Sequence, residues 1–144
     1  MAMISDVLKE KGGEVVSVNP GTSVHEAIEV LVGNRIGCLL VREDDGPVEG
    51  ILTERDILRI VQRDPEGFAG SPVSEHMTRD VICAVPTDDL DYAMNVMTEN
   101  RFRRVPVMDG DDLAGIISIG DIVKALKSET EYEVRMLRKY IGSM

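Results

Sequence analysis

Two short segments of the sequence combine a hydroxyl side chain with a carboxylate three residues later. They are Thr53-Glu54-Arg55-Asp56 and Ser118-Ile119-Gly120-Asp121. This spacing is typical of a capping box, in which the hydroxyl accepts a hydrogen bond from a free backbone N–H at a helix start. The same helix start could bind a phosphate against Thr53 or Ser118, and Asp56 or Asp121 could accept hydrogen bonds from two ribose hydroxyls. The motif alone favours the cap, and the two interpretations are compatible.

An arginine cluster strengthens the binding interpretation of the second segment. The chain has 26 acidic against 16 basic residues and a net charge of -10, so an anionic ligand must meet a local group of basic side chains. Arginines occupy positions 101, 103 and 104, before Val105-Pro106. If 105–108 is a buried strand, Arg103 and Arg104 lie at the sheet edge, where a guanidinium can bind phosphate through two hydrogen bonds. A solvated charged face is the alternative.

Both segments belong to a duplicated unit. Pro20–Val41 aligns with Pro86–Val107, and Gly50–Ile57 aligns with Gly115–Ile122. A unit of roughly 60 residues is marginally stable alone, so the two copies are expected to pack on each other. The predicted boundaries are 1–66 for the first copy, 67–127 for the second and 128–144 for a further C-terminal helix.

The two copies differ at the arginine cluster. Where the second copy has Arg103 and Arg104, the first has Gly37 and Cys38, and Arg55 is the nearby cation of its motif. The two sites are therefore expected to differ in ligand or in affinity.

Hydrophobic periodicity predicts the order strand, helix, strand, strand, helix in each copy. Apolar residues recur at i, i+3, i+4 and i+7 from Val24 and again from Leu90, which is typical of amphipathic helices. The predicted caps are Ser23 and Asp89 at the helix starts, and Asn34 and Asn100 in the left-handed conformation at the ends. The strands are predicted at 15–18, 36–41 and 48–52, and at 82–85, 105–108 and 113–117, with the last helix of each copy beginning near Thr53 or Ser118.

The C-terminal helix has Val134, Leu137 and Ile141 on one face and charges on the other. Such a helix either packs on its own chain or contributes to a subunit interface, and the pattern leaves both open.

Composition and spacing exclude several classes of function. No apolar run reaches the length of a bilayer span, and the first residues lack the pattern of a signal peptide, so a cytoplasmic protein is expected. The acidic net charge disfavours nucleic acid and anionic lipid as partners. Cys38 and Cys83 lie in apolar runs and are expected to be core thiols, while His25 and His76 have no spacing suited to zinc.

The doubled unit, with its Gly-Ile-Leu/Ile-Thr/Ser-x-x-Asp-Ile ends and its Arg-Arg-Val-Pro-Val strand, resembles a tandem pair of CBS domains, also called a Bateman module. The resemblance implies an α/β (α+β) fold of two βαββα repeats with pseudo-twofold symmetry, followed here by the C-terminal helix. It also implies an adenosine-containing ligand in the cleft between the repeats, such as AMP, ADP, ATP, NAD or S-adenosylmethionine. Members commonly form flat, disc-like homodimers.

The resemblance also assigns roles to individual residues. The hydroxyl and carboxylate of each motif would contact phosphate and ribose, and the arginines before the strand proline would approach phosphate. The ligand residues expected on this basis are Thr53, Asp56, Arg103, Arg104, Ser118 and Asp121. Arg55, the nearby cation of the first motif, and Pro106, the strand proline, complete the expected site. The first strand of each copy would offer backbone groups to adenine, from Val16, Ser17 and Val18 and from Ile82, Cys83 and Ala84.

The function expected from these features is a regulatory adenine-nucleotide sensor with no catalytic cofactor, acting on an unidentified protein. The alternative is a ligand-free dimerisation adapter in which the motifs are only helix caps. An enzyme is the least favoured class, because 144 residues cannot hold a (β/α)₈ barrel and neither cysteine has a paired base.

Overall fold

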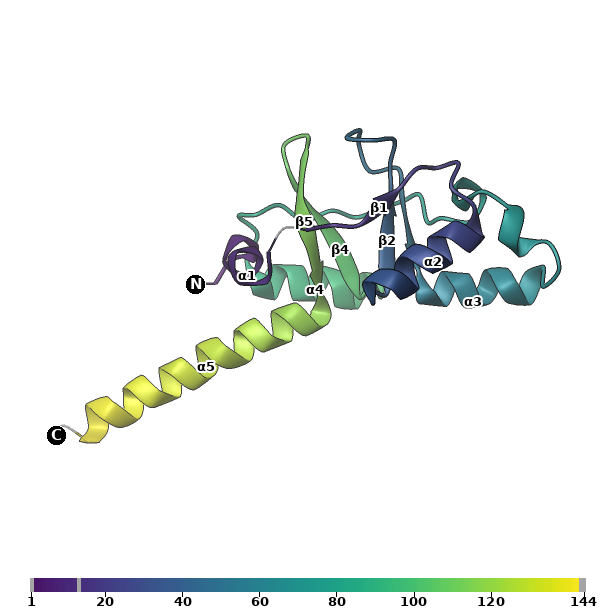
Figure 1. Ribbon diagram of the computed structural model, residues 1–144. Coiled ribbons are helices and arrows are strands. Elements are labelled where there is room, and N and C mark those ends of the chain that lie inside the picture. Colours follow the sequence, from purple (N-terminus) through teal and green to yellow (C-terminus); the bar gives the residue numbers. More distant parts are fainter. Residues whose placement is uncertain (1, 13, 143–144) are drawn as a thin grey trace. The chain divides into compact units, whose positions relative to one another are not determined.

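Aliphatic side chains at strand and helix spacing form two hydrophobic cores in this protein. The computed structural model describes residues 2–12 and 14–142, and Figure 1 shows how its helices and strands follow one another along the chain. One compact unit is Glu14–Ile82, here called the N-repeat unit. The other combines Met1–Gly13 with Cys83–Met144, here called the C-repeat unit. Each unit contains one copy of the repeat.

The N-repeat unit is built on a three-stranded sheet with the order β1-β2-β3. Its elements are β1 (Ser17–Val18), α2 (Val24–Asn34), β2 (Cys38–Val41), β3 (Gly50–Thr53), α3 (Glu54–Arg63), and the short 3-10 helices η1 (Phe68–Gly70) and η2 (Val73–Glu75). β1 runs parallel to β2, with Ser17 opposite Leu40, and β2 runs antiparallel to β3, with Leu40 opposite Ile51. The alternating burial of β3 follows from a sheet with one face covered. The core of the N-repeat unit contains Val24, Ala27, Leu31, Leu39, Val41, Leu52, Ile60, Val73 and Met77.

The C-repeat unit is built on a two-stranded antiparallel sheet. Its elements are α1 (Ile4–Lys11), α4 (Leu90–Asn100), β4 (Arg104–Asp109), β5 (Asp112–Ser118) and α5 (Ile119–Gly142). The predicted strand at 82–85 is reduced to one parallel bridge, in which Ala84 donates to the Pro106 carbonyl at 2.9 Å and accepts from the Met108 amide at 2.8 Å. The core of the C-repeat unit contains Ile4, Val7, Ala84, Leu90, Ala93, Met97, Val105, Val107, Ile117 and Ile122.

The segments that precede each repeat are exchanged between the units. In the C-repeat unit the Ile4 amide donates to the Asp88 carbonyl and the Ser5 amide donates to the Pro86 carbonyl. In the N-repeat unit the Val73 amide donates to the Thr22 carbonyl and the Ser74 amide donates to the Pro20 carbonyl, which are the equivalent bonds. The equivalent bonds confirm the duplication. The predicted boundaries 1–66 and 67–127 follow sequence order and therefore differ from the compact units.

Two details of the predicted helices are wrong. The left-handed residues after α2 and α4 are Arg35 (φ 55°) and Arg101 (φ 60°) rather than Asn34 and Asn100. The asparagines are still helical, and each side-chain amide donates to the carbonyl four residues earlier at 2.8 Å. The predicted N-caps are confirmed: the Ser23 hydroxyl accepts from the Glu26 amide and the Asp89 carboxylate accepts from the Asp91 amide.

The C-terminal helix is not a separate element at 128–144. α5 continues without a break from Ile119 to Gly142, because this stretch contains no proline and consists largely of good helix formers. The prediction that both cysteines are core residues is also wrong. Cys38 is half-buried and Cys83 is exposed, since residues around Cys83 form no regular strand.

Leu39 lies at the centre of β2 and is completely buried. We expect Leu39→Ala to lower the free energy of unfolding by about 2–5 kcal/mol, because it removes buried methyl groups and leaves a cavity. Leu58 on α3 is 72% exposed, so Leu58→Ala should change it by less than about 0.5 kcal/mol. Chemical denaturation measures both values, and similar losses for the two variants would contradict the placement of β2.

Candidate functional site

The first candidate motif lies where β3 ends and α3 begins. Thr53 is the N-cap of α3, and its hydroxyl accepts a hydrogen bond from the Asp56 amide at 3.3 Å. In return, Asp56 Oδ2 accepts from the Thr53 amide at 2.9 Å and from its hydroxyl at 3.0 Å. The side chain of Asp56 is only 14% exposed. The capping box that the sequence predicts is confirmed here.

The second motif repeats this arrangement between β5 and α5. The Ser118 hydroxyl accepts from the Asp121 amide at 3.1 Å, and Asp121 Oδ2 accepts from the Ser118 amide at 2.9 Å. One oxygen of each carboxylate therefore holds the turn from strand to helix.

A backbone hydrogen bond ties each helix start to the neighbouring strand. The Ile119 amide donates to the Arg103 carbonyl at 2.9 Å, and the Glu54 amide donates to the Gly37 carbonyl at 3.0 Å. Arg104 is also the direct register partner of Ser118. Arg103 is exposed and Arg104 is half-buried. The structure thus brings both predicted arginines to the strand end beside the second motif.

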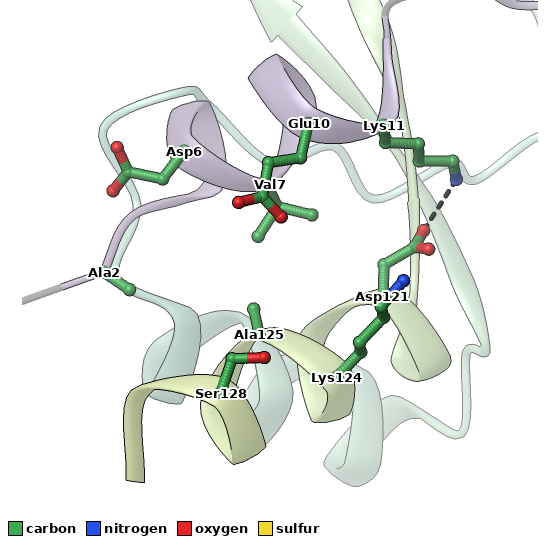
Figure 2. Close-up of a pocket in the computed structure, with 9 residues that line it drawn as sticks. All are labelled: Ala2, Asp6, Val7, Glu10, Lys11, Asp121, Lys124, Ala125 and Ser128. Atoms are coloured by element: carbon green, nitrogen blue, oxygen red, sulfur yellow. Dashed lines mark hydrogen bonds and ion pairs between the residues drawn. The ribbon is translucent and has the colours of Figure 1, made fainter. Parts of the chain in front are cut away.

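Lys11, which the sequence analysis did not select, contacts the second motif. Its ammonium lies 2.6 Å from Asp121 Oδ2 and donates to the Ile116 carbonyl at 3.0 Å (Figure 2). This contact exists because α1 packs in the C-repeat unit. Asp56 has a weaker basic neighbour, since Arg59 Nη1 is 3.8 Å from its Oδ1.

Asp121 is more acidic than an ordinary aspartate. Partial burial opposes ionisation and raises its pKa, but the hydrogen bonds from Lys11 and Ser118, with the positive charge of Lys11, outweigh burial. The net result is a lowered pKa. Asp121 is therefore a carboxylate at neutral pH and can act as a hydrogen-bond acceptor.

A pocket of about 320 Å³ lies between α1 and α5 in the C-repeat unit. Figure 2 shows Lys11 and Asp121 joined at one end of it, with Asp6 and Glu10 on α1 and Lys124 and Ser128 on α5. Among the ligand residues expected from the sequence, only Asp121 is part of the described lining. Arg103 and Arg104 are not among the residues described as lining this pocket.

The backbone groups expected to meet adenine are partly used by the sheet. The Val16 carbonyl accepts a hydrogen bond from the Leu40 amide of β2. The Val18 carbonyl accepts one from the amide of Arg42, the residue that follows β2. Since backbone groups alternate along a strand, those of Ser17 point to the open edge of the sheet. In the second copy, the Ala84 amide and carbonyl are both bonded to β4.

The remaining predicted residues have distinct positions. Arg55 is exposed on the first turn of α3, and Ile82 is half-buried at the end of the N-repeat unit. Pro106 is buried, with its carbonyl bonded to Ala84.

In 2–12 and 14–142 no three His, Cys, Asp or Glu side chains gather as metal ligands. Within the same ranges, none of the helices has the length and apolar content that a bilayer span requires.

The family model of the CBS domain matches this chain twice, at residues 4–63 and 73–128. The chain belongs to the CBS-domain family. The two matches confirm the expectation of two CBS repeats, and the CBS pair accounts for the doubled motif.

Proteins similar to this CBS pair are known from bacteria and plants. The crystal structure of the CBS-domain containing protein ATU1752 from Agrobacterium tumefaciens is 42% identical, with a TM-score of 0.82 over 86% of this chain and 98% of that one. The CBS domain-containing protein CBSX3, mitochondrial, of Arabidopsis thaliana is 32% identical over 96% of this chain and 71% of its own length. A crystal structure of CBSX2 in complex with AMP is 27% identical, with a TM-score of 0.75 over 90% of this chain and 99% of that one.

The ion pair between Lys11 and Asp121 makes stability depend on pH. A lowered folded-state pKa contributes stability above the ordinary aspartate value of about 3.9, and this contribution is lost as the pH falls through the folded-state pKa. We expect Lys11→Met to lower the melting temperature at pH 7 and to differ less from the wild type near about pH 3.

Lys9→Met is the matched control, because Lys9 lies on the same helix, is exposed, and forms no ion pair among the described side chains. If the difference in melting temperature between Lys11→Met and the wild type is the same at every pH, the ion pair does not contribute to stability. Lys11 would then stabilise the fold only through its hydrogen bond to the Ile116 carbonyl.

Proposed function

We propose that this CBS-domain protein is a regulatory module that binds an adenosine nucleotide through its two motifs. The observation that carries the proposal is the position of Arg103 and Arg104 beside the capped helix start at Ser118 and Asp121. The similar structure of CBSX2 in complex with AMP supports the choice of ligand class.

The start of α5 offers a phosphate one backbone donor. The Ile119 amide is bonded to the Arg103 carbonyl and the Asp121 amide to the Ser118 hydroxyl. Within the described chain this leaves the Gly120 amide without an acceptor, at the positive end of the helix dipole. Gly120 has no side chain to cover it, and a Cβ there would lie 3.6 Å from the Ser118 hydroxyl. We therefore propose that the phosphate of the ligand contacts the Gly120 amide and the Ser118 side chain.

Asp121 can serve the cap and the ligand together. The hydrogen bonds that it accepts from Ser118 and Lys11 both reach Oδ2. Among the described residues none reaches Oδ1, and a carboxylate oxygen has two lone pairs. We propose that Oδ1 accepts hydrogen bonds from the ribose hydroxyls. The capping and binding interpretations of the motif are then both satisfied by one side chain.

The arginines add charge for the phosphate. Among the described side chains, neither Arg103 nor Arg104 forms an ion pair, so their guanidinium groups can meet a phosphate without breaking another bond. The N-repeat unit has Gly37 and Cys38 at these positions, and the described basic side chains near its motif are Arg55 and Arg59. We infer that the C-repeat unit binds phosphorylated ligands more tightly than the N-repeat unit.

The ligand acts as a regulator in this proposal, and no catalytic cofactor is assigned. AMP is the first candidate, followed by ADP, ATP, NAD and S-adenosylmethionine. Such a ligand changes the activity of a partner only if it binds two arrangements of the protein with different affinity. The regulated protein, a homodimer and a cytoplasmic location stay predictions.

A ligand-free adapter is the second candidate, and one observation favours it. Both capping boxes are complete in the protein alone, with every hydrogen bond of the Thr53–Asp56 and Ser118–Asp121 pairs formed. Their residue types are thus explained by helix capping without a nucleotide.

Isothermal titration with AMP and the four other candidates distinguishes the two functions. We expect at least one ligand to bind the wild type, and Asp121→Asn to weaken its binding about tenfold to a hundredfold, because a hydrogen bond to a charged group contributes about 1.5–3 kcal/mol. Asp111→Asn is the control, since Asp111 is exposed in the turn between β4 and β5. Circular dichroism at the titration temperature verifies that each variant is folded.

The arginines give this experiment a second comparison. Arg104→Gln should weaken binding of the phosphorylated ligands and leave S-adenosylmethionine, which has no phosphate, unaffected. Binding that survives Asp121→Asn and is lost in Asp56→Asn would place the main site in the N-repeat unit. No binding of any candidate would favour the adapter.

A further inference from the structure

The C-terminal half of α5 carries an exposed apolar stripe. Val134, Leu137 and Ile141 are 41%, 60% and 67% exposed. Their spacing of three and four residues continues back to Thr130 and is that of a coiled-coil seam. From Thr130 to Ile141, every residue whose exposure is described is exposed on this long helix (Figure 1). The stripe is therefore uncovered within the described chain.

Charges along the same segment are separated by sign. The acidic residues Glu129, Glu131 and Glu133 come first, and the basic residues Arg135, Arg138 and Lys139 follow. No ion pair among the described side chains involves any of the six. The segment thus has an acidic half and a basic half on either side of Val134.

We propose that this stripe binds the same stripe of a second copy, with the two helices antiparallel. Setting Val134 against Leu137 of the partner subunit, and Thr130 against Ile141 of the partner subunit, aligns the residues of the seam in layers, with the apolar pair of Val134 and Leu137 at the centre. The acidic half of each helix then faces the basic half of the other. Glu131 and Arg138 occupy equivalent positions beside the seam, so each can pair with the other residue of the opposite copy.

The charge order selects a second copy as the occupant. A parallel pair would set the acidic halves against each other, which is repulsive. An anionic membrane would attract the basic half and repel the acidic half. An antiparallel copy of this helix is complementary over the whole segment, and the same patch on both chains gives the closed twofold contact of a homodimer. This inference does not depend on nucleotide binding.

Charge reversal in the full-length protein tests the pairing. One variant carries Glu129→Lys, Glu131→Lys and Glu133→Lys, and the other carries Arg135→Glu, Arg138→Glu and Lys139→Glu. Sedimentation velocity over a concentration series measures self-association. We expect the wild type to dimerise, each variant to dimerise at least about tenfold more weakly, and an equimolar mixture to form heterodimers, because opposite charges meet again.

A matched control separates this effect from a general change in net charge. Glu43, Asp45 and Glu49 are exposed in the N-repeat unit, and their replacement by lysine makes the same change in net charge as the first variant, away from α5. This control should dimerise like the wild type. A monomeric wild type, a charge-reversed variant that dimerises like the wild type, or a mixture that stays monomeric would each overturn the proposal.

Discussion

The fold and the site both depend on the hydrogen-bonded turn that joins the last strand of each repeat to its last helix. In this turn a carboxylate oxygen of Asp56 or Asp121 accepts from the backbone at the strand end, and the hydroxyl of Thr53 or Ser118 accepts from the backbone of the helix. The first helical amide also binds the carbonyl before the neighbouring strand. These bonds fix where the carboxylate and the helix dipole point, and the cap is thus a precondition of any ligand site here.

The two units share this turn and differ in the charges around it. The C-repeat unit adds Arg103 and Arg104 at the strand end, and Lys11 from α1 joins the carboxylate of Asp121. In the N-repeat unit the described basic side chains near the motif are the exposed Arg55 and Arg59, whose Nη1 lies 3.8 Å from Asp56 Oδ1. A duplication that keeps the backbone and varies the charges gives two positions of the same geometry with different electrostatics. Through the ion pair of Lys11 with Asp121, α1 contacts the second motif.

Much of this arrangement could be predicted from the sequence, because it rests on local signals. Hydrophobic periodicity predicts α2 and α4, and the hydroxyl-to-carboxylate spacing predicts both capping boxes that the structure contains. The exchange of leading segments could not be predicted, since Ile4 and Val73 make equivalent bonds and either could serve either unit. Lys11 was missed for the same reason: its contact with Asp121 depends on which unit α1 joins. The prediction of a strand at 82–85 is wrong, because the segment is joined to β4 by an isolated bridge at Ala84 and is not a regular strand.

A crystal structure of the protein grown with AMP tests the central claim directly, that one carboxylate both caps the helix and holds the ribose. The account predicts ribose hydroxyls within hydrogen-bond distance of Oδ1 of Asp121, the phosphate against Ser118 and the Gly120 amide, and the cap bonds to Oδ2 unchanged. A bound nucleotide whose ribose contacts neither Asp121 nor Asp56 would contradict the claim, and so would a carboxylate that leaves its cap in order to bind.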